Sequence, residues 1–130
     1  IPLRLVGSEM CIRDRTRTYY MLELPAEGSE DNEGGWRAIG YCGTMVVADT
    51  ADVQTIGVLP EYEGHGFGRA MLEQMHERAR ELGAERILLE VRADNPRAQR
   101  LYERNGYRAI HVRRGYYDDG TDAIIMECTF

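Results

Sequence analysis

The chain has 130 residues, of which 43% are hydrophobic and 29% charged, a balance typical of one soluble globular domain. Its apolar runs are far shorter than the roughly 20 residues of a membrane-spanning helix and no secretory leader opens it, so we expect a cytoplasmic protein without a membrane partner. The net charge of −6 argues against a nucleic-acid partner, because contact with phosphates needs a positive face.

The cysteines are widely spaced and show neither a metal-ligand pattern nor a disulfide framework. Cys42 and Cys128 lie in apolar, strand-like runs, where a cysteine is usually a small core residue. We therefore predict no metal site and a core position for these two side chains.

Residues 1–15 are predicted to lie outside the domain. They show neither helical nor strand periodicity, and they join the next segment without a turn signal. The string from Val6 to Arg15, VGSEMCIRDR, also resembles translated sequencing-adaptor read-through. We expect a non-native or disordered extension at residues 1–15 and a single domain at residues 16–130.

The rest of the chain divides into predicted strands and helices. Three strands come first, with a polar, acidic hairpin loop at Pro25–Gly35 and a turn at Asp49–Asp52 between them. Gly40 and Gly43 indicate a bulge or a close backbone approach in the second strand. In chain order, the elements are strands at Thr18–Leu24, Trp36–Val47 and Val53–Val58, a helix at about Gly68–Leu82, a strand at Ile87–Val91, a helix at Pro96–Asn105, and strands at Tyr107–Val112 and Ala123–Cys128.

The helices follow from a change of the apolar period from 2 to 3.6 after the third strand. Gly83 ends the first helix, and Asp94 or Asn95 is a candidate cap of the second, which Pro96 starts and Gly106 ends. A helix between two apolar strands implies parallel pairing, and the flanking hairpins imply antiparallel edges. The predicted fold class is α/β (α+β), with a mixed central sheet, a parallel β-α-β core and antiparallel flanking strands.

Three alternate glycines, Gly64, Gly66 and Gly68, open the first helix after the third strand. Glycines let backbone N–H groups approach a ligand closely, and a helix N-terminus adds unpaired donors and the positive end of its dipole. Together these groups form a cradle for a pyrophosphate. A mobile turn before a helix is the alternative, whereas a P-loop is excluded because no Gly-Lys-Ser/Thr follows.

Glu63–Gly68 resembles motif A of the GCN5-related N-acetyltransferases (GNATs), Gln/Arg-x-x-Gly-x-Gly/Ala. Leu88–Tyr107 (LLEVRADNPRAQRLYERNGY) and Arg113–Met126 (RRGYYDDGTDAIIM) are similar to segments of the bacterial GNATs that acetylate the N-terminal alanine of a ribosomal protein. The resemblance covers residues 18–127 and implies the GNAT fold without the strand and two helices that usually precede its first hairpin. Glu63 departs from the motif, and we expect its carboxylate to weaken cofactor binding without abolishing it.

The resemblance implies acetyl-coenzyme A (acetyl-CoA) as the cosubstrate, held between the two parallel strands where they separate. Backbone groups of Ile56–Val58 would pair with the pantetheine like an added strand. His65 is interpreted as a phosphate-side residue and not as a catalytic base, and Asn95 as a coenzyme contact, a helix cap, or both. The predicted cofactor-binding residues are Ile56, Gly57, Val58, Gly64, His65, Gly66, Phe67, Gly68, Arg69 and Asn95.

Acetyl transfer to an amine needs a base for the amine and an acid for the departing thiolate. Glu90 interrupts an apolar strand, where a buried carboxylate is costly; the alternative is an outward-facing residue or an ion pair with Arg92. Tyr102 lies on the apolar face of the second helix, where a ring packed in the core is the alternative. The resemblance implies Glu90 as the proton acceptor and Tyr102 as the proton donor to the thiolate.

The acceptor is expected to be a protein N-terminus, by resemblance the N-terminal alanine of a small-subunit ribosomal protein. Tyr116 and Tyr117, beside two aspartates, line the acceptor groove in one interpretation and form a solvated hairpin tip in the other. Two rival functions stay open, a GNAT with another amine acceptor and a truncated, non-catalytic coenzyme-binding module.

Overall fold

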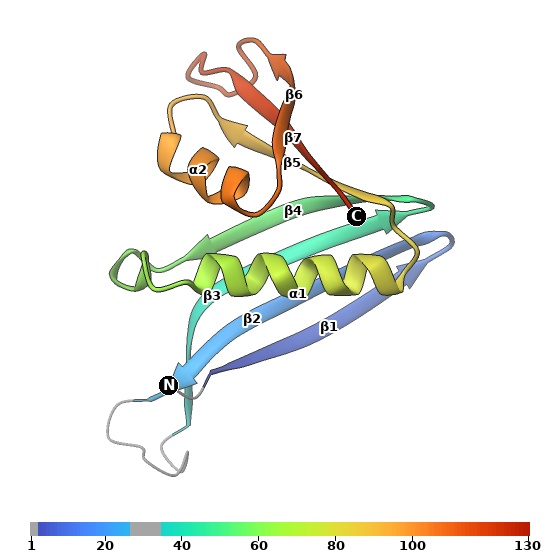
Figure 1. Ribbon diagram of the computed structural model, residues 1–130. Coiled ribbons are helices and arrows are strands. Elements are labelled where there is room, and N and C mark those ends of the chain that lie inside the picture. The colour runs from blue at the N-terminus through green and yellow to red at the C-terminus, as the bar shows by residue number, and fades with distance from the viewer. Residues whose placement is uncertain (1–2, 27–34) are drawn as a thin grey trace.

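The computed structural model describes residues 3–26 and 35–130 (Figure 1). Its strands form one mixed sheet in the order β1-β2-β3-β4-β5-β7-β6. Neighbouring strands run antiparallel except β4 and β5, which are parallel and joined through α1, so the predicted fold class is confirmed. The elements are β1 (Arg4–Ile12), β2 (Arg15–Pro25), β3 (Trp36–Val47), β4 (Thr50–Val58), the 3-10 helix η1 (Pro60–Tyr62), α1 (Phe67–Glu81), β5 (Arg86–Arg92), α2 (Pro96–Arg104), β6 (Arg108–Arg113) and β7 (Ala123–Thr129).

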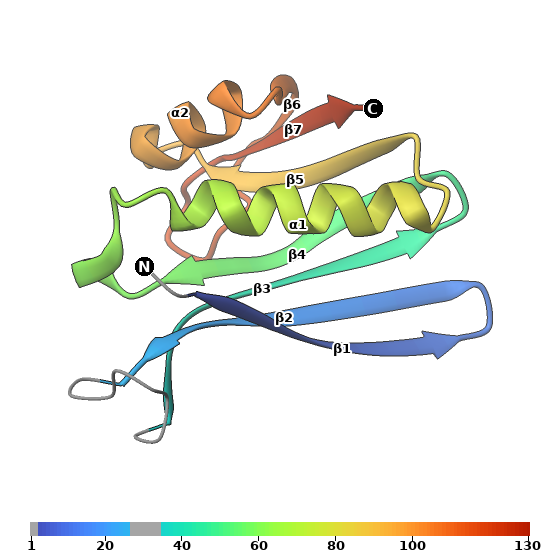
Figure 2. The ribbon, with the colours of Figure 1, turned by 60° about the horizontal axis from the view of Figure 1, so that its bottom comes forward.

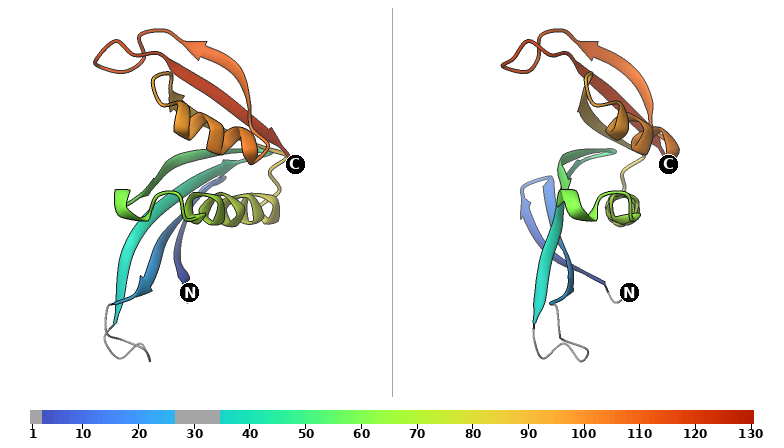
Figure 3. Two further views of the ribbon diagram at one scale, coloured as in Figure 1. Left: turned by 60° about the vertical axis from the view of Figure 1, so that its left-hand side comes forward. Right: turned by 90° about the vertical axis from the view of Figure 1, so that its left-hand side faces the viewer.

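Both α-helices lie on the same side of the sheet (Figure 2 and Figure 3). Helix α1 packs across β3 and β4, and its apolar stripe enters the core with Met71 and Met75 almost fully buried. From the sheet, Leu22, Ile39 and Ile87 meet this stripe in one hydrophobic cluster. Helix α2 contributes a single buried residue, Tyr102, to the same cluster. Cys42 and Cys128 are buried as predicted.

The parallel strands β4 and β5 separate soon after they begin (Figure 1). Their pairing consists of Thr50 with Arg86, Ala51 with Ile87 and Asp52 with Leu88. Beyond this point β4 stays paired with β3, and β5 stays paired with β7. The edge of β4 from Val53 to Val58 that faces β5 therefore has no strand partner among the described residues.

Two of the glycines in β3 sit at close approaches, as predicted. A Cβ atom on Gly43 would lie 2.4 Å from the ring of Tyr19, and one on Gly40 would lie 3.0 Å from the carbonyl oxygen of Gly57. The β3–β4 ladder also shifts between Gly43 and Thr44, where β4 carries one extra residue, Gln54. A second shift, in the β2–β3 ladder, leaves Ile39 as an extra residue of β3 beside Gly40, so the predicted bulge in this strand is confirmed.

The predicted turn at Asp49–Asp52 is wrong, because β4 already begins at Thr50. The turn is confined to Ala48 and Asp49, with Ala48 in the left-handed region at φ 53°. Ala51 is fully buried. The polar residues at positions 49–52 suggest a turn, but residues 50–52 form a strand because they pair with β3 on one side and with β5 on the other. The predicted Pro25–Gly35 loop falls mostly on residues 27–34, which lie outside the described residues.

Residues 4–12 form strand β1, so the expectation of a disordered extension is wrong for them. The strand pairs with β2 from Arg4 opposite Glu23 to Ile12 opposite Arg15. Only Leu5 packs against the core and the other residues of the strand are exposed, which explains the missing alternation. A strand therefore does precede the first predicted hairpin, whereas no helix precedes it within the described residues 3–14. That residues 1–15 are non-native stays a prediction.

Candidate active site

A cavity of about 700 Å³ lies between the end of β4, the glycine loop Glu63–Gly68 and helix α2, and we call it the cofactor cavity. Tyr62 and Leu101 add apolar surface to its wall. The structure brings together around it all but one of the predicted cofactor residues, together with the predicted acid: Ile56, Gly57, Val58, Gly64, Gly66, Phe67, Gly68, Arg69, Asn95 and Tyr102.

The first turn of α1 leaves backbone donors free beside this cavity. Gly66 is the N-cap in the left-handed conformation, with φ 84°, and no side chain caps the helix. The N–H groups of Phe67, Gly68 and Arg69 consequently have no acceptor within the described residues. A Cβ atom on Gly68 would lie 3.0 Å from Leu101, so glycine here also lets α1 and α2 approach. These donors and the helix dipole favour an anion.

His65 is the predicted cofactor residue that does not line the cavity. Its Nδ1 lies 3.1 Å from the carbonyl oxygen of Tyr62 and 3.0 Å from that of Glu63. Its ring stacks with Phe67 at 6.1 Å. One ring nitrogen is therefore turned to its own loop, which leaves Nε2 and the backbone of His65 for the predicted phosphate-side role.

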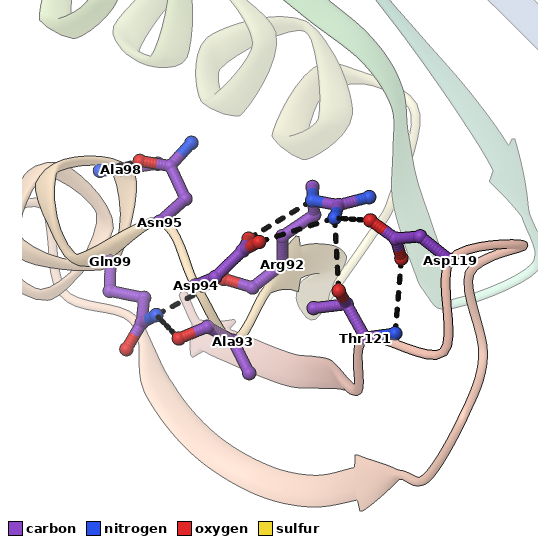
Figure 4. Close-up of polar contacts among 8 residues, drawn as sticks. All are labelled: Arg92, Ala93, Asp94, Asn95, Ala98, Gln99, Asp119 and Thr121. Atoms are coloured by element: carbon purple, nitrogen blue, oxygen red, sulfur yellow. Dashed lines mark hydrogen bonds and ion pairs between the residues drawn. The ribbon is translucent and has the colours of Figure 1, made fainter.

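Asn95 caps α2, which confirms one of its two interpretations (Figure 4), and it also lines the cofactor cavity. Its side-chain oxygen accepts a hydrogen bond from the N–H of Ala98 at 3.1 Å. The Gln99 side chain donates to the carbonyl oxygens of Arg92 and Ala93, each at 3.1 Å. These bonds hold the end of β5 against the start of α2, which fixes where Asn95 points.

Arg92 fixes the loop between β6 and β7 in the same region (Figure 4). Its guanidinium binds Asp94 at 3.0 Å, Thr121 at 3.0 Å and Asp119 at 2.5 Å. Hydrogen bonding from Arg92 lowers the pKa of Asp119 to about 2. The same guanidinium lies 4.7 Å from the ring centroid of Tyr117, so this loop is held over the end of β5.

Glu90 lines a second cavity of about 610 Å³, which we call the acceptor-side cavity. Its carboxylate lies 3.7 Å from Arg113, and the predicted alternative of an ion pair with Arg92 is wrong, because Arg92 binds Asp94 and Asp119 instead. Asp52 and Tyr117 line the cavity beside Glu90. Burial, and after it the charge of Glu90, raises the pKa of Asp52.

The two tyrosines of the β6–β7 loop both lie close to Glu90. Tyr117 is part of the cavity wall, which favours the acceptor-groove interpretation over a free hairpin tip. Burial and then the charge of Glu90 raise the pKa of Tyr117. Hydrogen bonding to Glu90 and then its charge raise the pKa of Tyr116, although that side chain is exposed.

Tyr102 is packed in the core and also lines the cofactor cavity. Its side chain is 7% exposed, and its ring meets that of Tyr107 edge to face at 5.8 Å. Its hydroxyl has no hydrogen-bond partner within residues 3–26 and 35–130. Burial, followed by the charge of Tyr117, raises the pKa of Tyr102, which keeps the phenol protonated at neutral pH.

Strand β4 lines both cavities in succession. Its residues 52–54 line the acceptor-side cavity and its residues 56–58 the cofactor cavity. Because both are lined by β4, the two cavities follow one another along one edge of this strand. Strands β4 and β5 separate at this edge. Glu90 thus reaches it from the acceptor-side cavity and Tyr102 from the cofactor cavity.

The fold and these cavities agree with one family of known proteins. The family model described as the acetyltransferase (GNAT) family matches residues 8–107. The chain belongs to the GNAT family. An Escherichia coli K12 protein named ribosomal protein bS18-alanine N-acetyltransferase is 43% identical over 86 residues, which are 64% of this chain and 58% of that protein.

Solved structures agree with the GNAT assignment. The crystal structure of the ribosomal-protein-S18-alanine N-acetyltransferase from Escherichia coli matches with a TM-score of 0.72 and 32% identity, over 92% of this chain and 71% of that one. A GNAT family acetyltransferase from Elizabethkingia anophelis with acetyl-CoA bound shares the fold, with a TM-score of 0.74 and 16% identity over 88% and 76% of the two chains. This chain spans about 60% of the length of the curated relatives it matches.

Five charged residues that line the two cavities of this GNAT site were not predicted, namely Glu73, Arg104, Asp52, Arg113 and Arg97. Asp52 was assigned to a turn, Arg113 lies inside a motif without a stated role, and Arg97 follows the cap of α2. Only Arg97 had a signal in the sequence, since a basic residue beside a helix start and a glycine loop is well placed to bind an anion.

Within the described ranges, no group of three or more His, Cys, Asp or Glu side chains fits a metal ion, and no helix is long and apolar enough to cross a membrane.

Proposed function

We propose that the chain is an acetyl-CoA-dependent N-acetyltransferase that acts on the N-terminal α-amino group of a protein. The acceptor we favour is the N-terminal alanine of a small-subunit ribosomal protein, because the relatives at 43% identity carry that activity in their names. One observation carries the proposal. The separation of β4 and β5 leaves a cavity with Tyr102 and a cavity with Glu90 next to each other.

The residues of the cofactor cavity suit acetyl-CoA. Free N–H groups at Phe67 to Arg69 and the positive end of α1 match a pyrophosphate. The unpaired edge of β4 at Ile56–Val58 offers the backbone groups that an extended pantetheine arm needs. Acetyl-CoA, when bound, supplies an activated thioester carbonyl for attack by an amine.

Glu90 acts as the proton acceptor in this proposal. A free α-amino group has a pKa of about 8, so most acceptor molecules are protonated at neutral pH and must lose a proton before the amine attacks. The Glu90 side chain is 36% exposed, which lets it take this proton directly or through a water molecule. The amine nitrogen then forms the new amide bond as the carbon–sulfur bond breaks.

Tyr102 acts as the proton donor to the departing sulfur. A thiol has a pKa of about 8.5, below that of a phenol, so a neighbouring phenol transfers its proton as the thiolate charge develops. Burial keeps the pKa of Tyr102 raised, so the donor form is present across the neutral range. Its hydroxyl is held by no other described side chain and is available to the ligand.

Release of free thiol with synthetic peptides tests the proposal. A peptide beginning with alanine should be acetylated, while the same peptide with a blocked N-terminus should not. We expect Glu90→Gln and Tyr102→Phe each to lower kcat by about 10²–10⁴-fold, because each removes one proton transfer. Full activity in both variants would refute the assigned roles.

The same assay separates the rival functions. Faster transfer to lysine side chains or small amines would point to a GNAT with another acceptor. Coenzyme binding without transfer to any amine would point to a non-catalytic module.

A further inference from the structure

Four of the five charged side chains that line the cofactor cavity form two arginine–glutamate pairs, and the fifth is Arg104. Arg69 binds Glu73 at 2.9 Å within α1, one helical turn apart. Arg97 binds Glu63 at 3.1 Å, and this pair joins the glycine loop to the first turn of α2. The second pair therefore connects two opposite walls of the cavity, whereas the first stays on one wall.

The guanidinium of Arg97 lies against the glycine loop. A Cβ atom on Gly64, which has φ 80°, would come within 3.5 Å of Arg97 Nη2. The nearby N–H groups at the start of α1 have no acceptor among the described residues. Arg97 thus stands beside donors that suit an anion, yet its own charge is matched by the Glu63 carboxylate.

The weakness of this ion pair would let Arg97 exchange Glu63 for another anion. The Arg97 side chain is 64% exposed and that of Glu63 is 41% exposed, and exposed ion pairs contribute little net stability. A guanidinium also forms charge-assisted, bidentate hydrogen bonds with a phosphate group, which carries more negative charge than one carboxylate. A carboxylate left behind at the surface is solvated by water, so its release costs little.

We propose that Glu63 and Arg97 form an electrostatic latch across the cofactor cavity, and that Arg97 passes from Glu63 to a phosphate of the coenzyme on binding. The latch rests on the proposed function, since it needs a phosphate-bearing coenzyme in this cavity. It also gives Glu63 a role, because the carboxylate holds Arg97 in the free protein and lowers the affinity for the coenzyme.

Calorimetric titration of the whole chain with coenzyme A tests the latch. Glu63→Gln should bind coenzyme A about three- to tenfold more tightly than the unaltered chain at low ionic strength. Glu61→Gln removes an equal charge from η1, close to the glycine loop but outside the cavity lining, and it should change affinity by less than about twofold. Arg97→Gln should weaken binding more in the Glu63→Gln background than in the unaltered chain, because there Arg97 has no competing partner.

The outcomes separate the latch from the function on which it rests. Pantetheine, which carries no phosphate, should show no gain with Glu63→Gln. If the unaltered chain binds coenzyme A but Glu63→Gln binds it no better than Glu61→Gln, the latch is wrong and the proposed function stands. An absent effect of Arg97→Gln in the Glu63→Gln background also overturns the latch. Failure of the unaltered chain to bind coenzyme A overturns both.

Discussion

A buried hydrogen bond between His76 and Tyr107 should be a main support of the wall behind the active site. His76 Nε2 lies 2.6 Å from the Tyr107 hydroxyl, and the two side chains are 8% and 4% exposed. Tyr107 also packs against Tyr102, so the bond ties the middle of α1 to the ring of the proposed acid. Tyr107→Phe removes only the hydroxyl oxygen and keeps both ring contacts.

The cost of this change follows from burial. The imidazole nitrogen would lose its partner in a place that water does not reach, and an unsatisfied buried polar group costs about 1–3 kcal/mol. For a chain of this size, that loss corresponds to a fall in Tm of roughly 4–12 °C. We expect kcat to change little in comparison, since the Tyr102 ring keeps its neighbour.

Thermal unfolding followed by circular dichroism, with urea titration as a second measure, tests the prediction. Tyr41→Phe is the matched control, because the Tyr41 side chain is 49% exposed. It should change the free energy of unfolding by less than about 0.5 kcal/mol. Equal stability losses in Tyr107→Phe and Tyr41→Phe would refute the reasoning.

Two further predictions concern His76 and Asn95. Burial, and then the charge of Arg80, lowers the pKa of His76, so the unfolded chain takes up a proton at higher pH than the folded chain. The free energy of unfolding should therefore fall as the pH drops below about 6.5, and this group should contribute at most about 1.4 kcal/mol per pH unit to the fall. In urea titrations at several pH values, His76→Gln should lack this contribution to the pH dependence. Asn95→Ala should cost about 1 kcal/mol through loss of the α2 cap, whereas Asn95→Asp should keep the cap but weaken coenzyme A binding by its added charge; equal stability of all three chains would contradict the cap.

Local patterns in the sequence predicted most elements well. Helix α1 was expected at Gly68–Leu82 and is found at Phe67–Glu81, because its apolar stripe and the glycine that follows it are both local signals. The second strand was expected and found at Trp36–Val47. The glycine loop and Asn95 also lie where predicted, since a helix start and its cap are set by residues next to each other in the chain.

Features that depend on distant partners were harder to predict. Strand β1 has no alternation, because its register comes from hydrogen bonds to β2 and not from a buried face. Asp52 was placed in a turn, because its strand character comes from β3 and β5. For Glu90, the alternative of an ion pair with Arg92 was wrong, because its partner is Arg113, which reaches it from β6.

The sequence by itself determined the order of the core elements, the family, and the glycine loop with its free backbone donors, because each of these rests on spacing within one segment. Only the tertiary structure decided that Glu63 is held by Arg97 and that Glu90 and Tyr102 belong to separate, adjacent cavities. Both results depend on how far β4 and β5 diverge and on how closely α2 approaches the loop. Those distances come from packing between residues far apart in the chain, which spacing within a segment cannot specify.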